Sequence, residues 1–103
     1  MADPMRIRAS VVGDATEVKV LMNHEMETGQ RKDSAGKVIP AWFIQTVTAT
    51  HNGKPVLAAQ WGPAISKNPF LSFKFKGGAK GDKVQITWVD NRGDKRTDEA
   101  TIA

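Results

Sequence analysis

The chain lacks cysteine, long apolar runs and any amphipathic helical pattern. Without cysteine it cannot form a disulfide framework, a thiolate zinc site or a covalent thiol intermediate on its own side chains. No apolar stretch reaches the roughly 18 residues of a membrane-spanning helix. The opening residues MADPMRIRAS also lack the apolar core of a signal peptide. We therefore expect no membrane-spanning segment, no signal peptide and no thiol chemistry.

A strong excess of charge of one sign is also missing. The 103 residues include 15 Lys or Arg and 11 Asp or Glu, which gives a formal net charge of +4. The basic residues are spread along the sequence, so the charge allows an anionic partner without requiring one. This length predicts a single domain over residues 1–103, in which roughly two-thirds of the unfolded surface is buried.

Alternation of apolar and polar residues is the dominant pattern of the sequence. It predicts seven short strands, at residues 5–12, 17–22, 42–51, 56–61, 70–76, 83–90 and 95–102. Asn52-Gly53 predicts a type I′ turn between the third and fourth strands, because both residues tolerate a positive φ. We predict an all-β fold, an immunoglobulin-like β-sandwich of about seven antiparallel strands. A five-stranded oligonucleotide-binding barrel is the alternative fold.

Two stretches resemble phosphate-binding or nucleic-acid-binding motifs without matching them. GGAKGDK at residues 77–83 lacks the spacing of a phosphate-binding loop and precedes a strand rather than a helix. FLSFKFK at residues 70–76 interleaves aromatic residues with lysines, as single-stranded nucleic-acid sites do. However, alternation places Phe73 and Phe75 on one face and the lysines on the other, which favours a core strand with a solvated face.

Residues 23–40, NHEMETGQRKDSAGKVIP, differ from the rest of the chain. They are too polar for a strand and too weakly periodic for a helix. Ordinary connections span about 4–6 residues, and longer ones are usually functional or disordered. We interpret this segment as the specific part of an otherwise plain β scaffold.

No constellation of residues indicates catalysis. His24 and His51 are the only histidines, and neither has partners at metal-ligand spacing. Glu25 and Glu27 are close together in a charged segment, where pairing with neighbouring basic residues is the commoner arrangement. Ser66 does not lie in a nucleophile elbow. We therefore expect no catalytic residue, no metal site and no cofactor, in a protein that is not an enzyme.

Several separated pieces of the sequence together resemble one known family. They are HEMETGQRKD at residues 24–33, Gly36-Lys37, Ile39-Pro40, NGKPV at 52–56, PAISKNPF at 63–70, and Trp88-Val89-Asp90 followed by Gly93. In this order and spacing they resemble the Z subunit of the Sox sulfur-oxidation carrier protein. The resemblance extends over essentially the whole chain.

The resemblance implies an immunoglobulin-like sandwich that pairs with a second sandwich subunit, the Y chain. In that family the Y chain carries a cysteine on a flexible glycine-rich arm near its C-terminus, and this cysteine holds thiosulfate-derived sulfur intermediates. The resemblance thus implies a non-catalytic subunit of a heterodimeric carrier in thiosulfate oxidation. It also implies transient docking to sulfur-oxidation enzymes, with neither nucleic acid nor membrane as a partner. The family is periplasmic, which implies export of the Z chain together with the signal-bearing Y chain.

The segment at residues 23–40 is the expected recognition element. We expect its residues His24, Met26, Arg31 and Asp33 to contribute to partner binding. The alternative is an internal role, in which Arg31 pairs with Glu27 or Asp33 and Gly29 makes a left-handed bend that folds the segment onto the sandwich. The alternative function is an oligonucleotide-binding module, which predicts binding of single-stranded DNA that weakens steeply with salt.

Overall fold

Each alternating stretch of the sequence forms a strand. The structure, a computed structural model, describes residues 4–103. Its strands are β1 (Arg6–Val12), β2 (Ala15–Leu21), β3 (Ile44–His51), β4 (Lys54–Gln60), β5 (Phe70–Lys76), β6 (Lys83–Asp90) and β7 (Lys95–Thr101). Within the described residues, no helix is long and apolar enough to cross a bilayer.

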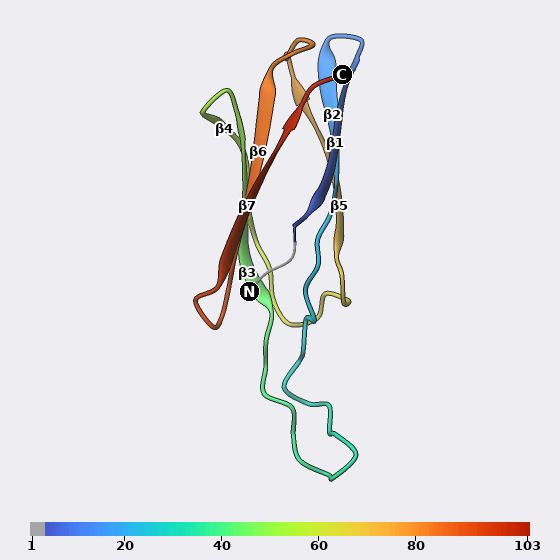
Figure 1. The fold of residues 1–103 in the computed structure, drawn as a ribbon, viewed down its shortest axis with the longest axis vertical. Helices are drawn as coiled ribbons and strands as arrows, with labels where there is room; N and C mark the ends of the chain where they lie inside the picture. Colours follow the sequence, from blue (N-terminus) through green and yellow to red (C-terminus); the bar gives the residue numbers. More distant parts are fainter. Residues whose placement is uncertain (1–3) are drawn as a thin grey trace.

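The strands form two sheets that pack face to face (Figure 1). One sheet has the order β1-β2-β5 and the other β4-β3-β6-β7, and every neighbouring pair is antiparallel. This arrangement confirms the predicted immunoglobulin-like sandwich, and the alternative of a five-stranded barrel is wrong. β5 and β6 have the predicted bounds, whereas the other strands begin or end one or two residues away from them.

Turn geometry explains why some predicted bounds are displaced. Val12 pairs with Ala15 across the first hairpin, so β2 begins two residues before its predicted start. Asn52 and Gly53 have φ values of 48° and 85°, and these confirm the predicted turn with a positive φ at both central positions. Because this turn is so tight, β4 begins immediately after it, at Lys54.

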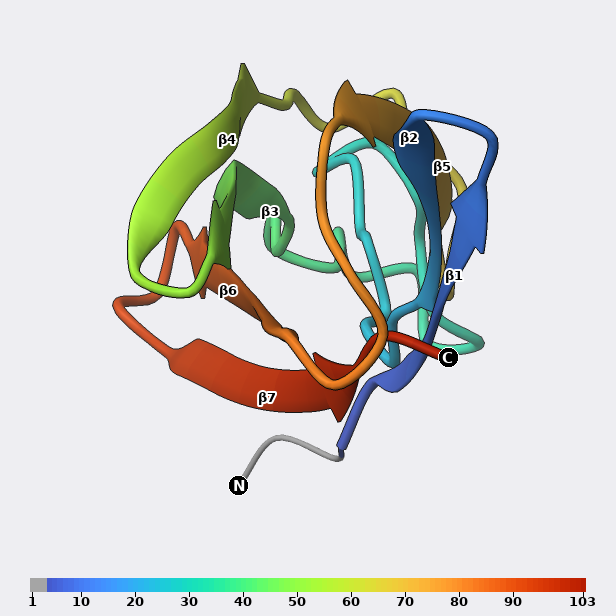
Figure 2. The same cartoon turned by 90° about the horizontal axis from the view of Figure 1, so that it is seen from above.

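The two sheets face one another (Figure 2). The core lies between them and is built from the inward residues of each alternation. β2 supplies Val18 and Val20, and β6 supplies Val84, Ile86 and Trp88, all at most 1% exposed. Each such side chain stabilises the fold by about 1.5–3 kcal/mol relative to an exposed position.

β5 confirms the predicted division of its faces. Phe75 is buried and Phe73 is half-buried against the core, whereas Lys74 and Lys76 are exposed. The exposed ring of this strand is Phe70, at its first position. Because the other two rings point inward, β5 does not offer successive rings on which bases could stack.

The C-terminal residues close one flank of the sandwich. The N–H of Ala103 donates to the carbonyl of Ala9 at 2.9 Å, and the N–H of Val11 donates to the carbonyl of Ala103 at 3.3 Å. Figure 2 shows the C-terminus beside β1. These contacts protect part of the outer edge of β1, which would otherwise present unpaired backbone groups.

The turn after β5 depends on a close approach of backbone to side chain at Gly78. Gly78 has a φ of +89°, and a Cβ added there would clash with Oγ1 of the buried Thr16. That hydroxyl donates to the carbonyl of Gly77 at 2.8 Å, so it cannot rotate away without losing this bond. We predict that Gly78→Ala lowers the free energy of unfolding in urea by about 2 kcal/mol or more.

Gly81→Ala is the matched control for this prediction. Gly81 has a similar φ of +93°, but nothing lies within 4 Å of an added Cβ. Gly81→Ala should therefore lower the free energy of unfolding by only about 1 kcal/mol, because a left-handed backbone is unfavourable for alanine. Equal losses in the two variants would show that the contact with Thr16 adds nothing.

Candidate partner-binding loop

Residues 22–43 connect β2 to β3 and project from one end of the sandwich (Figure 1). This segment, called the long loop below, helps to give the molecule its elongated shape of 52 × 21 × 20 Å. Its two legs meet at isolated bridges between Glu27 and Trp42 and between Lys32 and Val38. Gly29 has the expected left-handed φ, +86°. The pairing of Arg31 with Glu27 in the alternative internal role is confirmed, and Met22 and Met26 at the base of the loop are buried in the core. The distal part of the loop extends away from the sheets (Figure 1), so the predicted folding onto the sandwich is wrong for that part.

A buried carboxylate joins both legs of the long loop to the sandwich. Asp90, the last residue of β6, is 2% exposed. Its Oδ2 accepts hydrogen bonds from Nε2 of His24 at 3.0 Å and from Nε1 of Trp42 at 2.8 Å. Its Oδ1 accepts the backbone N–H groups of Arg92 at 2.9 Å and Asp94 at 3.0 Å. One side chain therefore holds the outgoing leg, the returning leg and the β6–β7 turn together.

The hydrogen bonds of His24 define its tautomer. Its Nδ1 accepts the backbone N–H of Met26 at 3.1 Å, so the neutral ring carries its proton on Nε2 and donates it to Asp90. The ring also packs against Trp42 and Trp88, with centroid distances of 4.9 and 5.1 Å. Because both ring nitrogens are engaged and the residue is buried, His24 supports the base of the loop from inside.

Asp90 is stabilised as a carboxylate despite its burial. Burial by itself raises the pKa of Asp90, but the hydrogen bonds from His24, Trp42 and two backbone N–H groups outweigh it and lower the pKa below its ordinary value. The guanidinium carbon of Arg92 lies 4.3 Å from the centroid of the Trp42 ring. This cation–π contact helps to hold the indole in position to donate to Asp90.

Met26 is a strained point of the outgoing leg. Its φ is +52°, in the left-handed region that non-glycine residues rarely adopt, and its side chain is buried. Its N–H donates to His24, and its sulfur accepts the backbone N–H of Ile44 at 3.3 Å. Strained residues persist where surrounding contacts hold them in place, and they cluster at functional sites.

A second set of contacts joins the base of the loop to the segment before β5. The N–H of His24 donates to Oδ1 of Asn68 at 3.1 Å, and the N–H of Asn68 donates to the carbonyl of His24 at 2.8 Å. Next to this pair, Nζ of Lys67 lies 3.3 Å from the carboxylate of Glu25. These contacts position Asn68 and Lys67 beside the first residues of the loop.

Arg31 and Asp33 lie farther along the loop. Arg31 makes a bidentate ion pair with Glu27, with Nε–Oε1 at 3.0 Å and Nη2–Oε2 at 2.5 Å. This hydrogen-bonded guanidinium lowers the pKa of Glu27, and the Arg31 side chain remains 64% exposed. Oδ1 of Asp33 accepts the backbone N–H groups of Ala35 and Lys37 at 2.9 and 3.0 Å. Asp33 thus shapes the tip, while Arg31 is accessible to a partner.

The structure brings two of the four predicted partner-binding residues to one surface. Met26 and Arg31 line a hollow of about 420 Å³ together with Glu25, Glu27, Thr28 and Lys67. His24 is buried in the Asp90 network, and Asp33 lies in the turn at the tip. Partner binding by these four residues stays a prediction.

The sequence patterns do not predict Asp90, Trp42 or Asn68 as site residues. Asp90 and Asn68 lie within pieces of sequence that carry the family resemblance. Their position in these pieces is the signal that could have identified them as site residues. Asp90 is 66 positions from His24, and Asn68 is 44 positions from it. Hydrogen bonds between residues so far apart in the sequence produce no local pattern from which they could be predicted.

The fold defines an immunoglobulin-like β-sandwich that several solved structures share. A hypothetical protein from Pyrococcus horikoshii OT3 aligns with a TM-score of 0.64 and 18% identity, over 99% of this chain and 89% of that chain. A superoxide reductase in the oxidized state aligns with a TM-score of 0.63 and 16% identity, over 99% of this chain and 89% of that chain. The superoxide reductase (neelaredoxin) from Ignicoccus hospitalis aligns with a TM-score of 0.61 and 14% identity, over 98% of this chain and 80% of that chain. At these identities the similarity shows the fold alone.

The assignment to a family rests on the sequence rather than on these structural neighbours. The family model described as "Sulphur oxidation protein SoxZ" matches residues 5–101, which include both sheets and the long loop. The chain therefore belongs to the SoxZ family and is a component of the Sox sulfur-oxidation system. A comparison with curated proteins finds no match.

Replacement of Asp90 tests whether its network stabilises the loop and the fold. Asp90→Asn keeps the shape but puts an amide NH₂ group among N–H donors, so at least one buried donor loses its acceptor. We predict a loss of about 3 kcal/mol in the free energy of unfolding, measured in urea. Asp94→Asn is the matched control, because Asp94 is exposed on the same turn. It should change the stability by less than about 0.5 kcal/mol, and a loss equal to that of Asp90→Asn would contradict the role of the network.

The lowered pKa of Asp90 predicts a specific loss of stability in acid. The folded-state pKa lies below the unfolded value, so the carboxylate stabilises the fold above about pH 4 and loses this contribution as the pH falls through the folded-state pKa. Between about pH 6 and pH 3, the wild type should lose more free energy of unfolding than Asp90→Asn. Urea titrations at each pH measure this difference, and parallel pH profiles would contradict the prediction.

Proposed function

We propose that this chain is the non-catalytic subunit of a heterodimeric sulfur carrier, paired with the cysteine-bearing Y chain in thiosulfate oxidation. The observation that carries the proposal is the SoxZ family match over residues 5–101. The chain has no cysteine of its own, so the covalent sulfur intermediate belongs on the Y chain. This subunit holds the Y chain while the cysteine arm enters the active sites of sulfur-oxidation enzymes. We place the pair in the periplasm, with the two chains exported together.

The long loop offers a surface suited to such pairing. Its base is held by the buried Asp90 network, so binding there costs less conformational entropy than ordering a free loop. The exposed guanidinium of Arg31 lines the hollow, and arginine is enriched in interfaces. Arg31 contacts the Y chain in this proposal, whereas His24, Met26 and Asp33 position the loop.

The long loop is one part of the interface in this proposal. Stable pairing buries upwards of about 1,200 Å² in total. Val38, 54% exposed on the returning leg, adds apolar surface next to the tip of the loop. The remaining area comes from the body of the sandwich.

Native mass spectrometry of the chain co-expressed with a candidate Y chain tests the pairing. The expected result is a one-to-one complex in which any sulfur adduct is confined to the mass of the Y chain. Arg31→Ala should raise the Kd of the pair by about tenfold, because it removes an accessible guanidinium from the hollow. The control is Lys54→Ala, at the β3–β4 turn at the other end of the molecule from the loop (Figure 1), which should leave the Kd unchanged.

Thermal unfolding of the unpaired variants separates binding from stability. If Arg31→Ala combined with Asp33→Ala weakens pairing at an unchanged Tm, the loop is a recognition element. If it lowers the Tm and leaves pairing intact, the two residues have the internal role. A chain that stays alone and unmodified beside the Y chain would overturn the proposed function.

A further inference from the structure

The outward-facing residues of β1, β2 and β5 form regular rows across the three-stranded sheet. The strand register places Arg6, Leu21 and Phe70 in one row, Arg8, Lys19 and Ser72 in the next, and Ser10, Glu17 and Lys74 in the third. These nine residues and Lys76 are called the basic face below. Because they alternate with core residues, they all point to the same side of the sheet.

The basic face carries a net charge as large as that of the whole chain. Its five cations and its single carboxylate, Glu17, give a net charge of +4, which equals the formal net charge of the chain. The remaining charged residues therefore balance one another. Glu17 lies 3.6 Å from Lys19 and 3.9 Å from Lys74. Among residues 4–103, no carboxylate lies within ion-pair distance of Arg6 or Arg8.

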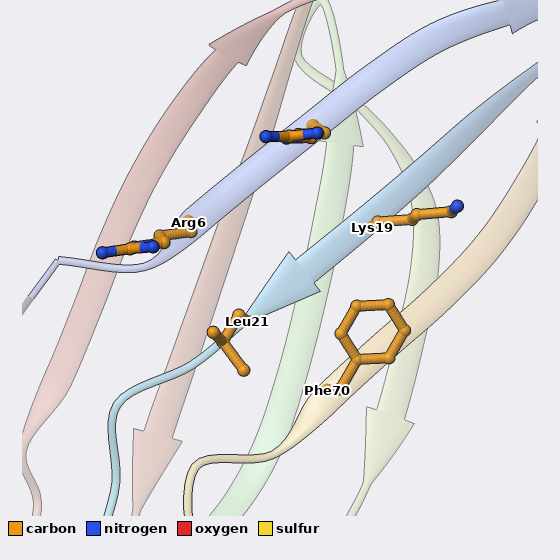
Figure 3. A pocket seen from close by; sticks show the side chains of 5 residues that line it. Arg6, Lys19, Leu21 and Phe70 are labelled. Atoms are coloured by element: carbon orange, nitrogen blue, oxygen red, sulfur yellow. The ribbon is translucent and has the colours of Figure 1, made fainter.

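An exposed apolar pair lies at one end of this face. Leu21 is 39% exposed and Phe70 is 62% exposed, and the register makes them direct neighbours. Together with Arg6, Arg8 and Lys19 they line a shallow hollow of about 280 Å³. Figure 3 shows Leu21 beside the ring of Phe70, with Arg6 and Lys19 at the border of the pair. The hollow is thus apolar in its centre and cationic at its rim.

We propose that the basic face docks an acidic protein segment that carries an apolar side chain. The apolar side chain contacts Leu21 and Phe70, and carboxylates on either side of it meet Arg6, Arg8 and Lys19. The local excess of positive charge attracts such a segment at long range, which speeds association and makes it salt-dependent. A contact on one face of a three-stranded sheet is small and therefore transient. It uses none of the long-loop residues, so variants of this face and variants of Arg31 test the two proposals separately.

The same observations disfavour two other occupants. A second copy of the chain would bring another face of charge +4 against the first, and like charges repel across an interface. Single-stranded nucleic acid binds through successive rings, but Phe70 is the one outward ring of β5, and Phe73 and Phe75 face the core. The apolar pair favours a protein segment.

An NMR titration of the isotope-labelled full chain with a synthetic peptide tests the proposal. The peptide Glu-Asp-Glu-Leu-Phe-Glu-Asp-Glu supplies both charge and apolar side chains, and a matched peptide with Ser-Ser in place of Leu-Phe supplies charge alone. We expect shift changes confined to β1, β2 and β5 and a Kd that rises steeply with salt. The Ser-Ser peptide should bind at least about fivefold more weakly.

Variants of the chain locate the contact. Arg6→Glu combined with Arg8→Glu should raise the Kd by at least about tenfold, and Phe70→Ser should raise it by about fivefold. The matched control is Lys54→Glu combined with Lys95→Glu, which makes the same charge change at exposed positions of the other sheet. It should leave the Kd within about twofold. All these positions are exposed, and the amide spectra report in the same experiment that each variant is folded.

Three results would overturn the proposal. An equal loss of peptide affinity in the control variant would show that the net charge of the chain alone attracts the peptide. Shift changes outside the basic face, or none at millimolar peptide, would exclude docking at this surface. Tighter binding of single-stranded oligothymidine than of the peptide on the same face would assign it to nucleic acid instead.

Discussion

The position of the long loop depends on one buried carboxylate. Asp90 accepts four hydrogen bonds, from the outgoing leg, the returning leg and the β6–β7 turn. A carboxylate buried without these donors would be strongly destabilising, and the donors without the carboxylate would be left unpaired. The two sides of the network therefore require one another. Because the connection is made at the base of the loop, the loop can extend from the sandwich and still keep a defined direction.

This arrangement separates two surfaces of different chemistry. The hollow at the loop contains both acidic and basic side chains and is shaped by the ion pair between Arg31 and Glu27. The basic face of the three-stranded sheet carries a charge of one sign around an apolar pair. The first suits a specific and lasting contact, in which geometry matters most. The second suits a weak, fast and salt-dependent contact. The carrier subunit proposed above, which stays with one partner and visits others, uses both kinds of surface.

The comparisons illustrate how fold and function separate. Superoxide reductases share the sandwich at 14–16% identity, whereas the SoxZ family model matches residues 5–101. A sandwich requires only alternation and turns, which many unrelated sequences supply. The pieces that carry the family resemblance include Asn68 and Asp90, which hold the base of the loop. Part of the family resemblance thus lies in residues that make contacts at the base of the loop.

Most of the fold was predictable, because strands and tight turns depend on residues that are neighbours along the chain. Alternation indicated the inward faces of β2, β5 and β6, and Asn52-Gly53 indicated its turn. The candidate site was much less predictable. His24 was expected to meet a partner, yet it is buried against Asp90, 66 positions away. Likewise, alternation could show that Arg6 and Phe70 point outward, but only the sheet register puts them in one row with Leu21. Contacts between distant segments arise when strands pair and layers pack, and no local pattern of residues encodes them.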